Sequence, residues 1–291
     1  MAATVSIIDD AISKAIGEPF VTQNTRAVGG GSINSASIIH SEKHSFFLKT
    51  NSLGFADMFE AEFDGLQELA NANAIRVPKA ICTGTTDSQV FLVLENLNMH
   101  SGSPQAASVL GRHLARLHKT QAEQFGWFRD NTIGSTKQVN QYSNNWVDFY
   151  REHRLQFQLA LAEENGFGGE LQQLGDRLCE DLARFFKDYE PYPALLHGDL
   201  WSGNYAYVND EPVIFDPATY YGDREADIAM TELFGGFPTA FYQAYSAELP
   251  LDKGYEQRKN LYNLYHILNH LNLFGSGYYS QAINMLKGLL P

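Results

Sequence analysis

The sequence predicts an α+β chain of two lobes, in which a small lobe of antiparallel strands with a helix precedes a larger, mainly helical lobe. Strand-like runs, either alternating or continuously apolar, are concentrated before residue 97, and helical spacing of apolar residues dominates after residue 104. The stretch 98–104 between them is polar. We therefore expect an N-terminal lobe of residues 1–96 and a C-terminal lobe of residues 97–291.

A strand and a helix of the small lobe supply a possible ion pair. Residues 45–50 alternate as a strand, with Phe47 and Lys49 on one face. Residues 55–71 carry apolar residues at helical spacing, and Glu62 lies at the edge of that stripe. A carboxylate there requires a cation, because burying an unpaired charge is costly, and Lys49 is the natural partner. Alternatively, Glu62 reaches water and Lys49 is a surface residue.

A glycine run precedes this strand. Gly29, Gly30 and Gly31 are followed by Ser32, and strand-like residues flank the run. Glycine backbone can direct N–H groups at phosphates, so these four residues are candidates for nucleotide binding. The run matches neither Gly-x-Gly-x-x-Gly nor the Walker A pattern, and a simple hairpin turn is the alternative.

A strand that is buried on both faces leads out of the small lobe. Residues 90–94 are continuously apolar, which predicts such a strand. Glu95, Asn96 and Leu97 follow it and join the lobes. We expect the backbone of these three residues to form a hinge that receives the edge of an adenine ring.

Helical periodicity predicts most of the larger lobe. The predicted helices cover residues 106–119, 146–163, 170–187, 226–233, 239–247, 256–274 and 279–289. A short strand over residues 194–196 follows Pro191 and Pro193, which end the third of these helices. This strand leads directly into the most informative motif of the chain.

That motif runs from His197 to Asn204. Asp199 lies inside it, and Asp216 follows two strand-like runs that a turn at residues 209–212 joins into a hairpin. Asn and Asp oxygens suit Mg²⁺, and a separate carboxylate can accept the proton of an attacking hydroxyl. The pattern therefore indicates phosphoryl transfer from ATP, with Asn204 and Asp216 as metal ligands and Asp199 as the base. An ordinary loop with a capping Asp is the alternative.

The order of these residues follows the protein-kinase pattern His-Arg-Asp-Leu, three residues and then Asn. Gly198 replaces the Arg that pairs with a phosphorylated activation loop, and Pro217 replaces the mobile Phe. Only 10 residues separate Asp216 from Asp227, which leaves no room for a long activation segment. We expect a small acceptor and no regulation by loop phosphorylation.

The chain resembles the fructosamine kinases, also called ketosamine 3-kinases, within the aminoglycoside-phosphotransferase-like branch of the protein-kinase fold. The likeness covers nearly the whole chain, and Trp201-Ser-Gly directly after Asp199-Leu is its most discriminating part. The residues that carry it are 195–204, 214–218, 221–225, 235–238 with Ala244-Tyr245, 153–156, and 268–270 with Phe274-Gly275.

The resemblance implies ATP-dependent phosphorylation of the sugar 3-hydroxyl of a ketoamine, a glycation adduct whose phosphorylated form decomposes and frees the amine. This would be a deglycation or repair activity. It implies the base and metal roles given above for Asp199, Asn204 and Asp216. It also implies that Lys49 and Glu62 form the clamp on the α- and β-phosphates.

The resemblance implies supporting roles as well. Asp227 resembles the helix carboxylate that braces the catalytic loop through backbone N–H groups, and His197 is expected to support the same loop. The hinge at Glu95 to Leu97 corresponds to the family's adenine site. Family members often have Cys in the glycine loop where this chain has Ser32, so the resemblance does not extend to thiol-based regulation through that loop.

Three further residues are candidates for acceptor binding. The indole of Trp201 could lie against the C–H face of a sugar, or it could pack and fix the loop. Trp146 and Arg154 are on a predicted helix that could face the acceptor, and packing is the simpler interpretation of both.

The composition excludes some functions. With 291 residues and 44% hydrophobic content, the chain can bury a sizeable core. Its net charge of −13 and lack of a basic cluster disfavour a nucleic-acid partner. No apolar run approaches bilayer length, no basic signal region is present, and the only cysteines are Cys82 and Cys179. We expect a cytoplasmic protein without membrane contact, as a monomer or weak dimer.

Two other functions fit the same motif. A kinase for an aminoglycoside, choline or homoserine would keep every catalytic residue and differ in its acceptor pocket. A catalytically silent nucleotide-binding module would normally have lost Lys49, Asp199, Asn204 or Asp216, and this chain retains all four. Ketoamines derived from fructose, ribulose or erythrulose, free or protein-bound, are all open as substrates.

Overall fold

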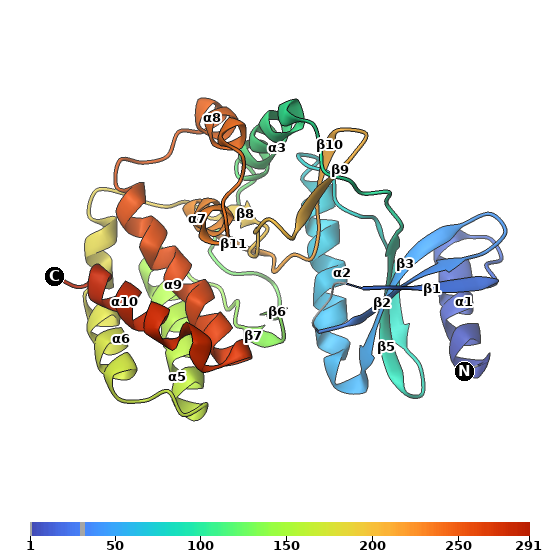
Figure 1. Ribbon diagram of the computed structural model, residues 1–291, viewed down its shortest axis with the longest axis horizontal. Coiled ribbons are helices and arrows are strands. Elements are labelled where there is room, and N and C mark those ends of the chain that lie inside the picture. Colours follow the sequence, from blue (N-terminus) through green and yellow to red (C-terminus); the bar gives the residue numbers. More distant parts are fainter. Residues whose placement is uncertain (1, 30–32) are drawn as a thin grey trace.

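The structure, a computed structural model, describes residues 2–29 and 33–291. Two lobes lie side by side along the long axis, with the N-terminus in the smaller lobe and the C-terminus at the far end of the larger one (Figure 1). The smaller lobe combines a sheet with helices, and the larger one is mainly helical. The predicted α+β class is confirmed.

The smaller lobe contains an antiparallel sheet with the strand order β1-β2-β3-β5-β4. Its elements are α1 (Ala2–Ile16), β1 (Asn24–Val28), β2 (Ser35–His40), β3 (Ser45–Ser52), a 3₁₀ turn (Leu53–Phe55), α2 (Ala56–Asn71), β4 (Ala80–Thr85) and β5 (Gln89–Glu95).

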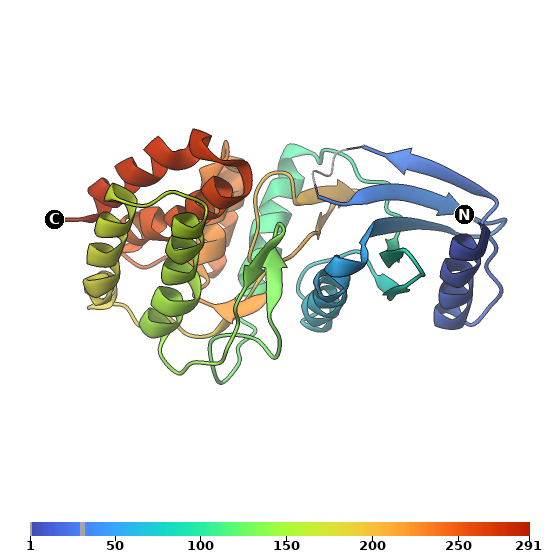
Figure 2. The ribbon, with the colours of Figure 1, turned by 90° about the horizontal axis from the view of Figure 1, so that it is seen from below.

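Each face of this sheet is covered by one of the two helices. Phe46 and Leu48 of β3 belong to an apolar cluster with α1, whereas Leu92 and Leu94 of β5 belong to a cluster with α2. Lys49 points to the α2 side, so the alternation predicted for β3 is confirmed. Figures 1 and 2 show α1 on the outer side and α2 between the sheet and the larger lobe.

The larger lobe is built from helices and short two-stranded sheets. Its elements are α3 (Pro104–Leu117), β6 (Asn131–Ile133), β7 (Thr136–Gln138), α4 (Trp146–Tyr150), a π-helical turn (Arg151–Gln156), α5 (Phe157–Glu164), α6 (Glu170–Glu180), a 3₁₀ helix (Leu182–Phe186), β8 (Ala194–Leu196), β9 (Tyr205–Val208), β10 (Glu211–Ile214), β11 (Tyr220–Gly222), α7 (Glu225–Leu233), α8 (Thr239–Glu248), α9 (Tyr255–Phe274), a 3₁₀ turn (Ser276–Tyr278) and α10 (Tyr279–Leu289).

Two of the predicted helices are interrupted. The helix predicted over residues 146–163 consists of α4 and α5 joined by the π-helical turn, and the helix predicted over residues 170–187 ends at Glu180 and is followed by a 3₁₀ helix. A π-helical turn inserts an extra residue, which rotates the helix faces after it. Arg154 and Leu155 are both buried within that turn.

The hairpin predicted after Asn204 is present. Strands β9 and β10 pair from Tyr205↔Ile214 to Val208↔Glu211, and the turn between them places Asn209 and Asp210 in the left-handed region, with φ of 52° and 63°. Asn and Asp tolerate this conformation better than most residues, which explains their presence there. The hairpin brings Asn204 and the segment after Phe215 together.

Apolar packing extends across the boundary between the two lobes. One buried cluster includes Phe59 of α2, Leu92 of β5, Leu110 of α3 and Leu195 of β8. The lobe boundary between residues 96 and 97 stays a prediction, although β5 ends at Glu95. Among the residues that the structure describes, no helix combines the length and the apolar character needed to cross a bilayer.

Candidate active site

The ion pair predicted between β3 and α2 is at the centre of the site. The Nζ atom of Lys49 is 2.6 Å from Oε1 of Glu62 and 2.5 Å from Oδ1 of Asp216. Lys49 is 7% exposed and Glu62 is 9% exposed, so the alternative of two surface residues is excluded. Lys49 therefore joins a helix of the smaller lobe to the end of the hairpin in the larger one.

The electrostatics of this trio keep the lysine charged. Burial alone would lower the pKa of Lys49, but the charges of Asp216 and Glu62 and their hydrogen bonds raise it above its ordinary value. Burial also raises the pKa of Glu62, and the charge of Lys49 opposes that effect. The site thus holds a fixed positive charge, which is what a phosphate clamp requires.

Asn204 lies between the other two predicted catalytic residues. Its amide nitrogen is 2.9 Å from the backbone oxygen of Asp199, 3.5 Å from Oδ2 of Asp199 and 3.5 Å from the backbone oxygen of Asp216. Because these contacts all use the nitrogen, the amide oxygen is the atom that could take a metal ion. Asp216 adopts a left-handed φ of 56°, and its side chain is 49% exposed.

Asp199 has the electrostatic character of a base. Burial, together with the charges of Asp216 and Asp227, raises its pKa to about 7, and a hydrogen bond from Asn204 opposes the shift. A carboxylate with a pKa near neutrality can accept a proton and release it again under physiological conditions.

Asp227 of α7 holds the catalytic loop through two backbone bonds. Its Oδ2 accepts a hydrogen bond of 2.8 Å from the backbone N–H of His197, and its Oδ1 accepts one of 2.8 Å from Gly198. His197 Nε2 lies 2.9 Å from the backbone oxygen of Phe215, and the N–H of Asp199 lies 3.3 Å from His197 Nδ1. His197 therefore donates through Nε2 and accepts through Nδ1, which fits a neutral imidazole, and burial lowers its pKa.

His118 supports this arrangement and is not predicted from the sequence. Its Nε2 is 3.2 Å from Oδ2 of Asp227, and its Nδ1 is 2.8 Å from the hydroxyl of Tyr245. Burial would raise the pKa of Asp227, but the hydrogen bond and charge of His118 hold it below its usual value. His118 follows the last residue of the amphipathic helix α3, and nothing in the local sequence indicates that it contacts Asp227.

We expect Asp227→Asn to weaken both the fold and the catalytic loop. The amide keeps one acceptor but turns its NH₂ group towards one of the two backbone N–H groups, which is then buried without a partner. The free energy of unfolding should fall by about 2 kcal/mol, and turnover should fall with it. Urea titration and initial rates would test this, with the exposed Asp148→Asn as the control. Equal stability of the two variants would contradict the bracing role.

The predicted hinge is ordered by its side chains. Glu95 Oε1 is 3.0 Å from Nη2 of Arg76, and the Asn96 amide nitrogen is 2.7 Å from Oγ of Ser45. These contacts fix the segment that continues to Leu97, whose role in adenine binding stays a prediction. Of the four residues of the glycine run predicted to bind nucleotide, the structure describes Gly29. The other three, Gly30, Gly31 and Ser32, lie outside the described residues.

Trp201 lies two residues after Asp199 and is open to solvent. Its side chain is 39% exposed, and its ring centroid is 6.4 Å from that of Phe234. Gly203 allows the indole to lie close over the loop, because a Cβ at this position would overlap the ring. The exposed indole agrees with acceptor contact.

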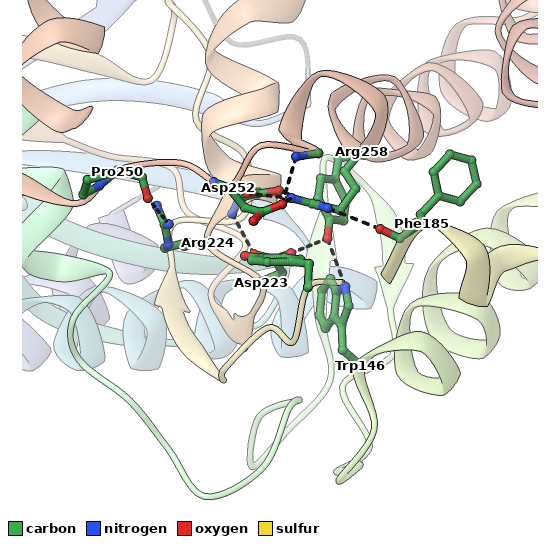
Figure 3. Close-up of polar contacts among 11 residues, drawn as sticks. Trp146, Phe185, Asp223, Arg224, Pro250, Asp252 and Arg258 are labelled. Carbon is green, nitrogen blue, oxygen red and sulfur yellow. Dashed lines mark hydrogen bonds and ion pairs between the residues drawn. The ribbon is translucent and has the colours of Figure 1, made fainter. Parts of the chain in front are cut away.

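The structure contradicts acceptor contact by Trp146. Its side chain is 3% exposed, and its Nε1 donates a hydrogen bond of 3.0 Å to the hydroxyl of Tyr262. Figure 3 shows it beside a buried polar cluster around Asp223 and Arg258. The hydroxyl of Tyr262 in turn donates to Asp223, so Trp146 supports the interior of the larger lobe.

Arg154 is likewise a core residue, and its predicted contact with an acceptor is wrong. Its side chain is fully buried, with Nη1 2.6 Å from the backbone oxygen of Val139 and Nη2 2.8 Å from Oδ1 of Asn140. The guanidinium carbon lies 4.1 Å from the centre of the Tyr220 ring. Both terminal nitrogens of the guanidinium are thus engaged inside the lobe, away from any acceptor.

Comparison with known proteins agrees with this geometry. The family model described as fructosamine kinase matches residues 4–291. The chain belongs to the fructosamine kinase family. It is therefore a phosphotransferase that acts on a hydroxyl group, and the resemblance stated from the sequence is confirmed.

Two relatives of this fructosamine kinase family member cover most of its length. A protein of Synechocystis named probable ketoamine kinase is 48% identical over 96% of this chain and 94% of its own length. A chloroplastic protein-ribulosamine 3-kinase of Arabidopsis thaliana is 45% identical over 92% of this chain and 84% of its own length.

Solved structures confirm the protein-kinase-like fold. A Haemophilus somnus protein assigned as a fructosamine-3-kinase has a TM-score of 0.90 at 32% identity, over 98% of this chain and 97% of its own. An aminoglycoside phosphotransferase has a TM-score of 0.60 at 16% identity over 97% of each chain, which is a likeness of fold alone.

Proposed function

We propose that this protein transfers the γ-phosphoryl group of ATP to the sugar 3-hydroxyl of a ketoamine. One observation carries the proposal, which is that five side chains from both lobes meet at one place. They are the buried pair Lys49 and Glu62, the carboxylate of Asp199 with its raised pKa, and the oxygen-bearing side chains of Asn204 and Asp216. The names of the full-length relatives, ketoamine kinase and ribulosamine 3-kinase, support the substrate class.

Asp199 and Lys49 would perform the two charge-handling tasks of the reaction. Asp199 accepts the proton of the acceptor hydroxyl as that oxygen forms its bond to the γ-phosphorus. The bond from that phosphorus to the β,γ-bridging oxygen breaks, and ADP leaves with the electron pair. Lys49, held by Glu62, balances the negative charge of the phosphates, which positions them and stabilises the leaving group.

Asn204 and Asp216 fit a magnesium ion. Both offer oxygen atoms, and Asp216 keeps an exposed carboxylate at the site. Within the described residues, no group of three or more His, Cys, Asp or Glu side chains could hold a metal ion alone. Mg²⁺ commonly binds one or two carboxylates and takes its other ligands from phosphates and water, and when bound it would neutralise charge on the transferring group.

Trp201 would bind the acceptor. A ketoamine presents a polyhydroxylated chain and an amine that carries a positive charge at neutral pH. An indole suits both parts, through its apolar face and through cation–π attraction. The exposed position of Trp201, whose backbone N–H is 3.2 Å from the backbone oxygen of Asp199, supports this role.

An acceptor panel tests the proposed function. The protein is incubated with ATP and Mg²⁺ and, separately, with ribulose-, erythrulose- and fructose-derived lysine, choline, homoserine and an aminoglycoside. Mass spectrometry should detect one added phosphate on the ketoamines only, and coupling between phosphorus and the C3 proton should locate it. Phosphorylation of choline or the aminoglycoside with the ketoamines untouched would refute the proposal. Full turnover in excess EDTA would refute the metal assignment.

A further inference from the structure

Helix α2 carries an acidic stripe that the nucleotide clamp does not use. Glu60, Asp64 and Glu68 recur at intervals of four residues, so they lie along one face of the helix, and Glu62 points to Lys49 from another. Like charges at this spacing repel one another, so the stripe weakens the helix unless it has partners.

The larger lobe supplies those partners. Nη1 of Arg129 is 2.6 Å from Oδ2 of Asp64, and Nη2 of Arg129 is 3.3 Å from Oε2 of Glu60. The hydroxyl of Tyr221 donates a hydrogen bond of 2.6 Å to Oε1 of Glu68. The whole stripe therefore contacts the other lobe.

Arg129 projects from a segment that is fixed in the larger lobe. The side-chain nitrogen of Asn140 is 3.2 Å from the backbone oxygen of Arg129. Two residues after Arg129, the side-chain nitrogen of Asn131 is 2.7 Å from the backbone oxygen of Thr219. The backbones of Gly126 and Tyr221 exchange two hydrogen bonds, each of 2.9 Å. Arg129 is thus tied to the segment that follows Asp216.

Helix α2 also lies directly on that segment. A Cβ atom at Gly65 would come within 3.0 Å of Oγ1 of Thr219 and within 3.8 Å of the ring of Pro217. A larger residue would push α2 away from Pro217 and from the preceding Asp216. The distance between Glu62 and Asp216, which share Lys49, therefore depends on how closely α2 docks here.

We infer that Arg129 is a positioning residue for the phosphate clamp, because its pairs with Asp64 and Glu60 dock α2 on the segment after Asp216. The inference rests on the proposed function of Lys49 and Glu62. Arg129 is 24% exposed and Asp64 is 29% exposed at the side chain, so this pair is less screened by water than an ordinary surface pair. Without Arg129, Glu60, Asp64 and Glu68 repel one another and α2 loosens.

The test compares Arg129→Ala and Arg129→Lys with Arg151→Ala. Arg151 is a matched control, since its side chain is 26% exposed and its Nη1 is 2.6 Å from Asp148 on a helix of the larger lobe. We expect Arg129→Ala to raise KM for ATP and lower kcat, with about a fivefold loss in kcat/KM for ATP and no change in KM for the ketoamine. Arg129→Lys should recover part of the loss, and Arg151→Ala should match the wild type.

Hydrogen exchange of the α2 amides gives a readout that does not depend on the acceptor. Exchange in residues 56–71 should be faster in Arg129→Ala than in Arg151→Ala, even if no ketoamine is a substrate and the proposed function fails. Equal exchange in the two variants would overturn the inference, and so would faster exchange with an unchanged KM for ATP. If Arg129→Ala does not fold, Asp64→Asn removes the same pair and is compared with Asp148→Asn in the same way.

Discussion

Asp199→Asn should lose nearly all turnover while ATP binds as it does in the wild type. The substituted amide has nearly the same shape but cannot accept a proton at neutral pH, so the rate should fall by about 10²- to 10⁴-fold. Affinity for ATP should stay within about twofold, because the proposed role of Asp199 is a contact with the acceptor and not with the nucleotide. Initial rates and calorimetric titration with a non-hydrolysable ATP analogue measure the two quantities.

Two further measurements make this result specific. The melting temperature of Asp199→Asn should be at or above that of the wild type, because the hydrogen bond from Asn204 to the backbone oxygen of Asp199 is unaffected and the substitution removes a buried charge near Asp216 and Asp227. A matched Asp148→Asn variant at the exposed surface should turn over normally. Wild-type turnover in Asp199→Asn would show that another group is the base.

Gly198→Ala is expected to give the largest loss of stability. Gly198 adopts φ of +84°, and a Cβ atom there would overlap the backbone oxygen of Ala218. The segments around Gly198 and Ala218 are held together by a hydrogen bond of 2.8 Å from the backbone N–H of Ala218 to the backbone oxygen of His197. Strain and overlap together should lower the free energy of unfolding by roughly 3 kcal/mol, and the displaced loop should lose activity.

A second glycine separates the two causes. Gly166 adopts a similar φ of +89°, but nothing lies within 4 Å of a Cβ atom added there. Gly166→Ala should therefore lower the free energy of unfolding by only about 1 kcal/mol, which is the strain of the left-handed conformation itself. Chemical denaturation measures both variants. Equal losses would mean that close approach to Ala218 contributes nothing.

The catalytic segment could be predicted because its geometry is local. Asp199, Asn204 and Asp216 are joined by a short loop and a hairpin, so their spacing along the chain determines their spacing in the structure. The Lys49–Glu62 pair was predictable for a different reason. Helical and strand periodicity placed both residues on facing surfaces, and the cost of burying a lone carboxylate made them partners.

Two elements of the small lobe, α1 and β4, lie where no element is predicted above. The β4 strand contains Gly84, and its pairing with β5 shifts register between Ala80 and Cys82. This irregularity breaks the alternation of inward and outward side chains by which a strand is recognised in a sequence. The helix α1 covers the outer face of the sheet, where Ile12 is fully buried. Its apolar spacing is visible in the sequence, but its docking face is defined by the sheet.

The partners of His118, Arg129 and Arg154 could not be predicted, since they are distant in sequence. His118 meets Asp227 across 109 residues, and Arg129 meets Asp64 across 65. Packing was the simpler interpretation of Arg154 from the sequence, but its partners could not be named. The π-helical turn directs it inward, onto the ring of Tyr220.

The hairpin of β9 and β10 also has a consequence for the order in which the site is assembled. Asn204 and Asp216 meet across 12 residues, whereas Lys49 and Asp216 meet across 167. Closing the short loop costs less chain entropy than closing the long one, which brings together segments of both lobes. The proposed metal-binding half of the site therefore belongs to a local folding unit of the larger lobe. We expect the contact between Lys49 and Asp216, which joins the lobes, to form after this unit.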